Sequence, residues 1–199
     1  IDSNPRILAR DHARNSALVQ AALERDGVTF RTGVRAVRIE AQAGEDGAHR
    51  VHLSDGSSAE GHEVLVSIGR AIPFEGLGLD SIGVKVDGRF PRPDEHLRLA
   101  PNVYVAGDPA GPELHTHLAH YQGEMVVRIA LGEEVTPDYR AIPRALYTDP
   151  EAASVGLLLE QALEAGYDAF EATADLGSTA KGYTAQVDGH ITIVVDRAT

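Results

Sequence analysis

One aspartate stands out as a residue that could take part in ligand binding. Residues 103–106 are β-branched, aromatic or small without polar interruption, and this run stops at Gly107, Asp108 and Pro109. The run predicts a short buried strand. A carboxylate therefore ends a strand, and in open α/β sheets ligands bind at the carboxyl ends of the strands.

A helix is expected to begin soon after Asp108. Residues 117–131 contain no proline, and their apolar side chains recur at helical spacing, as in Leu118, Tyr121, Met125 and Ile129. A helix N-terminus offers free N–H groups and positive potential to electron-rich ligand atoms. The carboxylate and the helix start together predict a cofactor site. The alternative is that Gly-Asp-Pro only turns the chain, as an isolated tripeptide of this kind usually does.

Three of the nine histidines lie near the start of this expected helix. His117 and His120 are three residues apart and share a helix face, whereas His115 precedes the helix. A metal site would need a complete ligand set, and no cysteine or carboxylate completes a recognisable one. We therefore predict no metal site and expect these side chains to pack or to lie beside the cofactor. No spacing of Ser, His and Asp suits nucleophilic catalysis either.

The composition is that of a soluble globular protein. Of the 199 residues, 43% are hydrophobic and 24% are charged, and no apolar run approaches the ~20 residues of a membrane span. The formal net charge of -12 opposes a nucleic-acid backbone or an anionic membrane surface as a partner. The absence of cysteine rules out a disulfide framework, and we expect a cytoplasmic location.

A known family has a similar motif around Asp108. Residues 102–111, NVYVAGDPAG, resemble the second flavin-contacting motif of the FAD-dependent pyridine nucleotide-disulfide oxidoreductases, the family of lipoamide dehydrogenase, glutathione reductase and mercuric reductase. The resemblance implies that Gly107 and Asp108 contact the ribityl and phosphate region of FAD. It also implies that the pyrimidine edge of the flavin faces backbone N–H groups of Leu114, His115, Thr116 and His117.

The first thirty residues predict a βαβ unit and hence a parallel sheet. Strands are expected at residues 1–2 and 28–30, on either side of a helix that Gly27 ends. Asp11 or Asn15 is expected to cap this helix. Its apolar face should consist of Ala17, Leu18, Ala21, Ala22 and Leu23.

Residues 34–39 and 51–53 are then expected to form a hairpin or meander, and residues 64–68 a further strand. The region resembles the nicotinamide domain of the same family. The resemblance places Asp2 at the adenosine ribose of NAD, Ala36 at the adenine and Gly69 close to the dinucleotide, where the missing Cβ lets the ligand approach. A solvated loop carboxylate is an equal alternative for Asp2. Arg6 leaves the choice of nucleotide open, since it could neutralise Asp2 or hold the extra phosphate of NADPH.

The middle of the chain is rich in Gly and Pro. Residues 70–100 predict a crossover between lobes with one short strand at residues 84–86. Residues 133–140 predict a linker, because Pro137 breaks any helix there.

Residues 142–157 resemble the opening strand and turn of the family's dimerisation domain. After them we expect a helix at residues 158–165 that ends at Gly166. Antiparallel strands are expected at residues 169–174, 184–187 and 191–195, with Asp188 and Gly189 as a hairpin turn.

These elements predict an α/β fold in three parts. They are the C-terminal part of a Rossmann-like NAD(P)-binding domain (1–69), the C-terminal segment of an FAD-binding domain (70–138) and the N-terminal part of an α+β dimerisation domain (139–199). Since the chain starts at Ile1 and stops at Thr199 after an apolar run, we interpret it as a fragment of a longer enzyme.

The resemblance implies a homodimeric flavoprotein oxidoreductase with FAD and NAD(P)H as cofactors. It would pass a hydride from NAD(P)H to FAD and on to a disulfide, metal-ion or other small-molecule acceptor, and none of its catalytic residues would lie in this chain. The alternative is a catalytically inactive dimerisation module.

Overall fold

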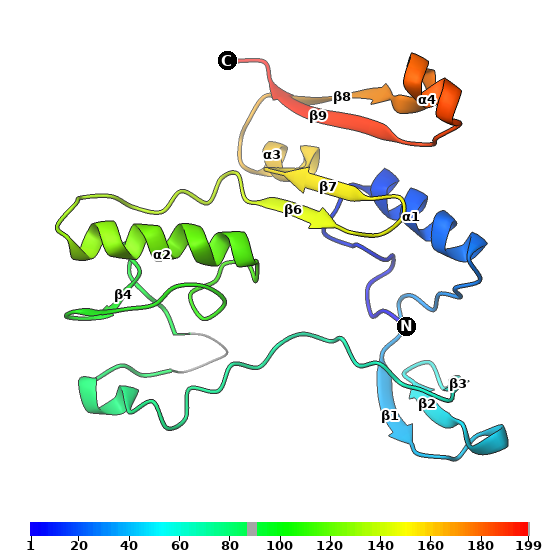
Figure 1. The fold of residues 1–199 in the computed structure, drawn as a ribbon, viewed down its shortest axis with the longest axis horizontal. Coiled ribbons are helices and arrows are strands. Elements are labelled where there is room, and N and C mark those ends of the chain that lie inside the picture. Colours follow the sequence, from blue (N-terminus) through cyan, green and yellow to red (C-terminus); the bar gives the residue numbers. More distant parts are fainter. Residues whose placement is uncertain (87–90, 199) are drawn as a thin grey trace. The chain divides into compact units, whose positions relative to one another are not determined.

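Residues 1–86 and 91–198 are described by a computed structural model, in which the chain divides into two units (Figure 1). The first unit contains residues 1–66 and 143–199, and the second contains residues 67–142. Both units contain helices and strands, which confirms the mixed α/β class that the sequence predicts. Every strand pair within the described residues is antiparallel, so the predicted parallel sheet is not formed there.

Helix α1 (Ala13–Arg25) ends before Gly27 as predicted, but its cap and its buried face differ from the prediction. Its N-cap is His12, whose ring Nδ1 accepts a hydrogen bond from the backbone N–H of Arg14 at 3.2 Å. The buried positions are Ser16, Val19 and Ala22, whereas Ala17 and Ala21 are exposed. The reason is the preceding loop, which covers this face: the hydroxyl of Ser16 donates to the carbonyl of Ile7 at 2.6 Å.

The segments on either side of α1 are not strands, contrary to the prediction for residues 1–2 and 28–30. The N–H of Asp2 donates to the carbonyl of Arg31 at 2.9 Å, and the N–H of Val34 donates to the carbonyl of Asp2 at 3.2 Å. These bonds align the two segments without building a regular ladder. A strand inside a parallel sheet needs neighbours on both sides, and the described residues do not provide them.

A three-stranded antiparallel sheet follows in the first unit, in the order β1 (Ala36–Glu40), β2 (His49–Leu53) and β3 (Ser58–Gly61), with the short 3-10 helix η1 (Glu45–Gly47) in the first connection. The predicted pairing of the first two runs is confirmed.

The third strand of this sheet differs from the prediction, because residues 58–61 pair with β2 and residues 64–68 form no strand. Leu65 is 93% exposed and Ile68 is 91% exposed. An apolar run of this kind has the composition of a central strand, but a central strand forms only between neighbouring strands. The described residues provide no such neighbours for residues 64–68.

The first unit ends with a hairpin, a helix and a two-stranded ribbon. Strands β6 (Pro143–Leu146) and β7 (Ala152–Val155) form the hairpin, α3 (Leu159–Glu164) is the predicted helix, and β8 (Ala169–Asp175) pairs with β9 (His190–Asp196).

The predicted strand at residues 184–187 is wrong, because residues 184 and 185 end the helix α4 (Ala180–Ala185), which follows η3 (Leu176–Ser178), and residues 186 and 187 form no strand. The hydroxyl of Thr179 caps α4 by accepting the N–H of Gly182 at 3.0 Å. A capped helical turn satisfies its own backbone groups, whereas a third strand would need an edge to pair with. Asp188 and Gly189 are therefore not a two-residue hairpin turn.

The second unit is organised around helix α2 (Thr116–Ala130), which matches the predicted helix within one residue at each end. Before it lie η2 (Leu79–Ile82), β4 (Arg98–Ala100) and β5 (Val103–Tyr104). Strand β5 is half-buried and shorter than predicted, because its described partner β4 is itself short. Residues 84–86 are not a strand, although Val84 is buried, and residues 87–90 of the predicted crossover lie outside the described residues.

The predicted linker at residues 133–140 contains no helix or strand. It is attached to α2 through the N–H of Asp138, which donates to the hydroxyl of Tyr121 at 2.8 Å. No helix in the part of the chain that the structure describes has the length and apolar composition required to cross a membrane.

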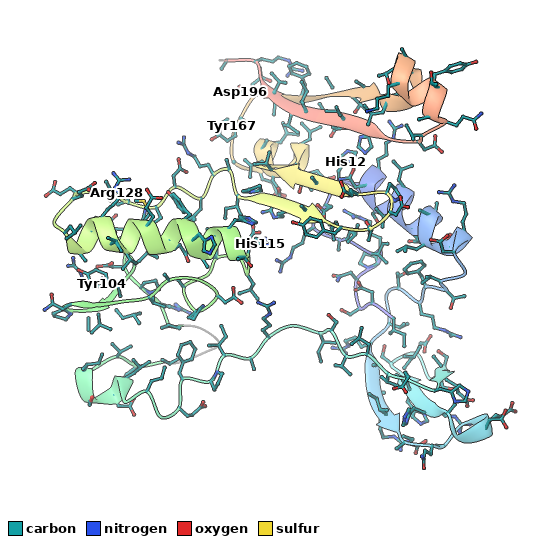
Figure 2. All side chains as sticks on the ribbon, viewed as in Figure 1. His12, Tyr104, His115, Arg128, Tyr167 and Asp196 are labelled. Atoms are coloured by element: carbon teal, nitrogen blue, oxygen red, sulfur yellow. The ribbon has the colours of Figure 1, made fainter. Side chains whose placement is uncertain are left out.

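A cluster of polar side chains holds α1 to the ribbon β8–β9 within the first unit; Figure 2 labels its member His12. The ring of His190 contacts Asn15 Oδ1 at 2.8 Å and Thr192 Oγ1 at 2.7 Å. His12 Nε2 lies 3.3 Å from a carboxylate oxygen of Glu171, and its ring centroid lies 5.3 Å from that of His190. Burial lowers the pKa of His190, and the charges of Arg14 and His12 lower it further.

This lowered pKa predicts that acid weakens the first unit. The unfolded chain, in which the pKa of His190 returns to about 6.5, takes up the proton more readily than the folded chain. The free energy of unfolding should therefore fall as the pH drops below about 6.5, by at most about 1.4 kcal/mol per pH unit for one group. Urea unfolding at several pH values between about 7.5 and 5.5 measures the slope.

The variant His190→Gln should show a shallower slope, and the control His62→Gln, at an exposed position, should keep the wild-type slope. Equal slopes in all three proteins would contradict the assignment. The carboxylates with lowered pKa values, such as Asp175 and Glu40, titrate below this pH range, because their ordinary pKa values of 3.8 and 4.5 already lie below it.

Candidate functional site

The loop that carries Asp108 runs between β5 and α2. It folds back on itself, since the N–H of Ala110 donates to the carbonyl of Gly107 at 2.8 Å and the N–H of Gly111 to that of Asp108 at 3.3 Å. The carboxylate of Asp108 forms an ion pair with the guanidinium of Arg70 at 2.5 Å. The side chain of Asp108 is 24% exposed and that of Arg70 is 67% exposed, so the carboxylate lies in a partly open position.

Gly107 brings this loop against the first turns of α2. Its φ is 78°, in the left-handed region, and a Cβ added to it would lie 3.2 Å from the Cβ of Ala119. Glycine avoids both the backbone strain and the crowding. The predicted juxtaposition of the strand end and the helix start is therefore present within the second unit.

The start of α2 presents backbone donors. The N-cap is His115, and its side chain makes no capping hydrogen bond. The first N–H groups of a helix have no acceptor within the helix, and they carry the positive end of its dipole. Leu114 and His115 are half-buried, whereas Thr116 and His117 are exposed. Figure 2 shows His115 and Arg128 at opposite ends of this helix.

Two of the three histidines near this helix start are stacked. The rings of His115 and His117 are nearly parallel, with centroids 5.0 Å apart, and His115 Nε2 lies 2.8 Å from a carboxylate oxygen of Glu113. Within residues 1–86 and 91–198, no group of three or more His, Cys, Asp or Glu side chains is arranged to hold a metal ion.

Gln122 ties the two ends of the Asp108 loop to α2. Its Oε1 accepts the N–H of Gly107 at 2.7 Å, and its Nε2 donates to the carbonyl of Gly111 at 2.6 Å. The same Nε2 donates to the hydroxyl of Tyr139 at 3.0 Å, and burial raises the pKa of that hydroxyl. The side chain of Gln122 has no exposed surface.

The residues expected to contact NAD(P)H are divided between the units. Asp2 and Ala36 belong to the first unit and Gly69 to the second. The Oδ1 of Asp2 accepts the N–H of Asn4 at 2.8 Å and its Nδ2 at 2.9 Å, and Asp2 is half-buried. Ala36 starts β1, opposite Leu53, and it is exposed, as is Gly69.

Arg6 does not pair with Asp2, so it does not neutralise that carboxylate, which was one of the two alternatives for Arg6. Its guanidinium donates to the carbonyls of Leu8, Ala9 and Asp11 at 2.6, 3.1 and 2.7 Å. Arg6 therefore holds the loop before α1.

Three residues of the second unit were not predicted from the sequence: Arg70, Glu113 and Gln122. Arg70 and Glu113 carry no signal beyond their charge, because their partners depend on the folded loop. Gln122 does carry one, since it falls on the buried face of α2 among Leu118, Met125 and Ile129. A polar residue at such a position needs a specific partner.

A carboxylate loop packed against a helix start in an α/β chain is typical of proteins that bind dinucleotide cofactors. Residues 1–123 match the family model described as pyridine nucleotide-disulphide oxidoreductase, and residues 142–199 match its dimerisation domain. The chain belongs to the pyridine nucleotide-disulphide oxidoreductase family, as its motifs predict.

Curated relatives cover almost the whole chain. The dihydrolipoyl dehydrogenase of Thermus scotoductus is 38% identical over 174 residues, which are 84% of this chain and 37% of that protein. The dihydrolipoyl dehydrogenase of Chlorobaculum tepidum is 30% identical over 205 residues, 100% of this chain and 43% of that protein. The chain thus spans about two fifths of the length of the curated relatives that it matches.

Solved structures agree with this membership. LpdA from Mycobacterium tuberculosis has a TM-score of 0.87 and 27% identity, over 99% of this chain and 43% of that one. The Cu(II) complex of the flavoprotein disulfide reductase RclA from Escherichia coli has a TM-score of 0.84 over 99% of this chain and 45% of that one. At 23% identity, the second likeness is one of fold alone.

The close packing of Gly107 predicts opposite effects for two glycines of the second unit. Gly107→Ala should lower the free energy of unfolding by about 1–2 kcal/mol, because its φ is positive and the new Cβ meets Ala119. Gly123→Ala, inside α2 with nothing near its added Cβ, should raise it by up to about 1 kcal/mol. Urea unfolding of both variants measures the difference, and effects of the same sign would contradict this account of Gly107.

Proposed function

We propose that the chain forms part of a homodimeric FAD-dependent oxidoreductase that passes a hydride from NAD(P)H to FAD and on to a disulfide, metal ion or other acceptor. The observation that carries the proposal is the Asp108 loop, held against the start of α2 in a chain of this family. Residues 1–69 would belong to the NAD(P)-binding domain, 70–138 to the FAD-binding domain and 139–199 to the dimerisation domain. The protein would work in the cytoplasm.

The residues of the second unit fit the chemical groups of FAD. The carboxylate of Asp108 would accept hydrogen bonds from ribityl hydroxyls, and Gly107 has no side chain to obstruct them. Backbone N–H groups at residues 114–117 and the dipole of α2 would favour negative charge at the pyrimidine edge of the flavin. When bound, FAD supplies the capacity to accept and release a hydride.

The ion pair of Asp108 with Arg70 affects how FAD would bind. Arg70 occupies one side of the carboxylate, so a ribityl hydroxyl would either share Asp108 with the guanidinium or displace it. His115, ordered by Glu113 and stacked on His117, would form the polar border of the same region.

An alternative proposal is a catalytically inactive module that self-associates through residues 141–199. Apolar side chains support it, because Val155, Leu157, Ile191 and Ile193 line a groove of about 840 Å³ in the first unit. Three of them, Val155, Ile191 and Ile193, are more than half exposed. The visible absorbance of the purified protein distinguishes the two proposals, since the module would carry no flavin.

The flavin proposal predicts that Asp108 contributes directly to cofactor affinity. The complete protein should carry FAD, and Asp108→Ala should bind it roughly ten- to a hundredfold more weakly, because a charge-assisted partner is lost. Flavin absorbance after dialysis and a fluorescence titration of the apoprotein measure occupancy and affinity. The control Glu133→Ala removes the partner of Arg128 near the other end of α2 and should bind FAD normally. Equal affinity in both variants would refute the role of Asp108.

A second prediction concerns the nucleotide. If Asp2 accepts the ribose hydroxyls, the extra phosphate of NADPH meets a like charge, and the complete enzyme should prefer NADH by roughly ten- to a hundredfold in kcat/KM. Asp2→Ser should reduce the preference mainly by improving NADPH. Arg6→Gln is the control and should leave the ratio unchanged, because the guanidinium is bound to three carbonyls. Equal use of both nucleotides by the unmodified enzyme would show that Asp2 lies elsewhere.

A further inference from the structure

Gln122 is the one large side chain of the described residues that is fully buried. It lies on the face of α2 that Leu118, Met125 and Ile129 otherwise make apolar. Burying an amide costs free energy unless its donor and acceptor are both satisfied. An apolar residue would fill this position without that requirement, so the contacts of the amide need an explanation.

Those contacts lie at the two ends of one loop. The Oε1 accepts the N–H of Gly107, and the Nε2 donates to the carbonyl of Gly111, at 2.7 and 2.6 Å. Asp108 lies between these two residues. The third contact, from Nε2 to the Tyr139 hydroxyl at 3.0 Å, reaches the linker after the helix.

The bonds of Gln122 add to the backbone bonds within the loop, which join Ala110 to Gly107 and Gly111 to Asp108. Gly107 and Gly111 have φ values of 78° and 64°, and glycine populates both signs of φ almost equally. Two glycines at the ends of a loop leave it many conformations in the absence of other restraints. The amide of Gln122 restrains both ends at once, and it does so from inside a helix.

We propose that Gln122 is a positioning residue that fixes the Gly107–Gly111 loop and thereby aims the Asp108 carboxylate at the ribityl region of FAD. This inference rests on the proposed function, in which Asp108 contacts FAD. The side chain of Gln122 has no exposed surface, so it would not contact the cofactor directly. It acts through the loop, because its two short bonds reach the backbone on either side of Asp108.

An isosteric acid tests the role of the donor. Gln122→Glu keeps an acceptor for the N–H of Gly107, but an ionised carboxylate cannot donate to the carbonyl of Gly111. Burial raises the pKa of such a carboxyl above its usual value near 4.3. The protonated form restores the donor, so the variant should bind FAD like the wild type at low pH and lose affinity as the pH rises.

The measurement is the FAD dissociation constant of the complete protein from about pH 5 to about pH 8, given as the ratio of variant to wild type. We expect this ratio to rise roughly tenfold to a hundredfold across the range. Tyr139→Phe, which keeps both loop bonds, should bind FAD within about threefold of the wild type at every pH. A residue that only fills the core would give a ratio independent of pH.

Hydrogen exchange of the apoprotein gives a second readout that does not require FAD. Gln122→Met has a similar shape and no amide, so residues 107–111 should exchange faster than in the wild type, while the ribbon β8–β9 keeps its protection. Unchanged exchange at residues 107–111, or a constant affinity ratio, would overturn the positioning role. A wild type without affinity for FAD, but with faster loop exchange in Gln122→Met, would refute the proposed function and leave the restraint of the loop established.

Discussion

The arrangement of the second unit depends on the buried amide of Gln122. A helix face that packs into a core normally carries apolar side chains, because each buried polar group must find a partner. Helix α2 departs from this rule at one position, and the partners are Gly107 and Gly111 before the helix and Tyr139 after it. One side chain therefore joins the loop, the helix and the linker, and the most buried part of this unit is also the part that shapes its candidate site.

Elements that complete their own hydrogen bonds could be predicted from the sequence. Helix α2 agrees within one residue at each end, and helix α3 lies where expected, since the signals for a helix are local. Sheet strands depend on distant partners. Residues 28–30 and 64–68 have strand composition, yet they find no ladder within the described residues. Residues 184–187 were predicted as a strand, but the helix α4 extends into them, because the side chain of Thr179 caps this helix.

In the candidate site too, features with local sequence signals could be predicted and contacts between distant residues could not. The position of Gly107 beside a helix start could be predicted, because a strand-like run ends at this glycine and a run with helical spacing follows a few residues later. Arg70 could not be assigned as the partner of Asp108, since the two residues are 38 positions apart and the contact exists only in the folded loop. Gln122 could have been noticed by its spacing from Leu118 and Met125, but its partners are backbone atoms, which a sequence pattern does not identify.

The Asp108–Arg70 ion pair and the hydrogen bonds of Gln122 differ in strength. This difference explains how the loop can be held in place while its carboxylate can still bind a ligand. The ion pair between Asp108 and Arg70 has a mostly exposed cation, and such pairs contribute only about 0–1 kcal/mol. An unmade hydrogen bond of a buried amide costs about 1–3 kcal/mol, and Gln122 makes three bonds. The backbone of the loop is therefore the firmly held part, and the partner of its carboxylate is the exchangeable part. In the proposed flavin complex, a ribityl hydroxyl would replace the guanidinium without a change in the loop beneath it, and a loop ordered in advance reduces the entropy lost on binding.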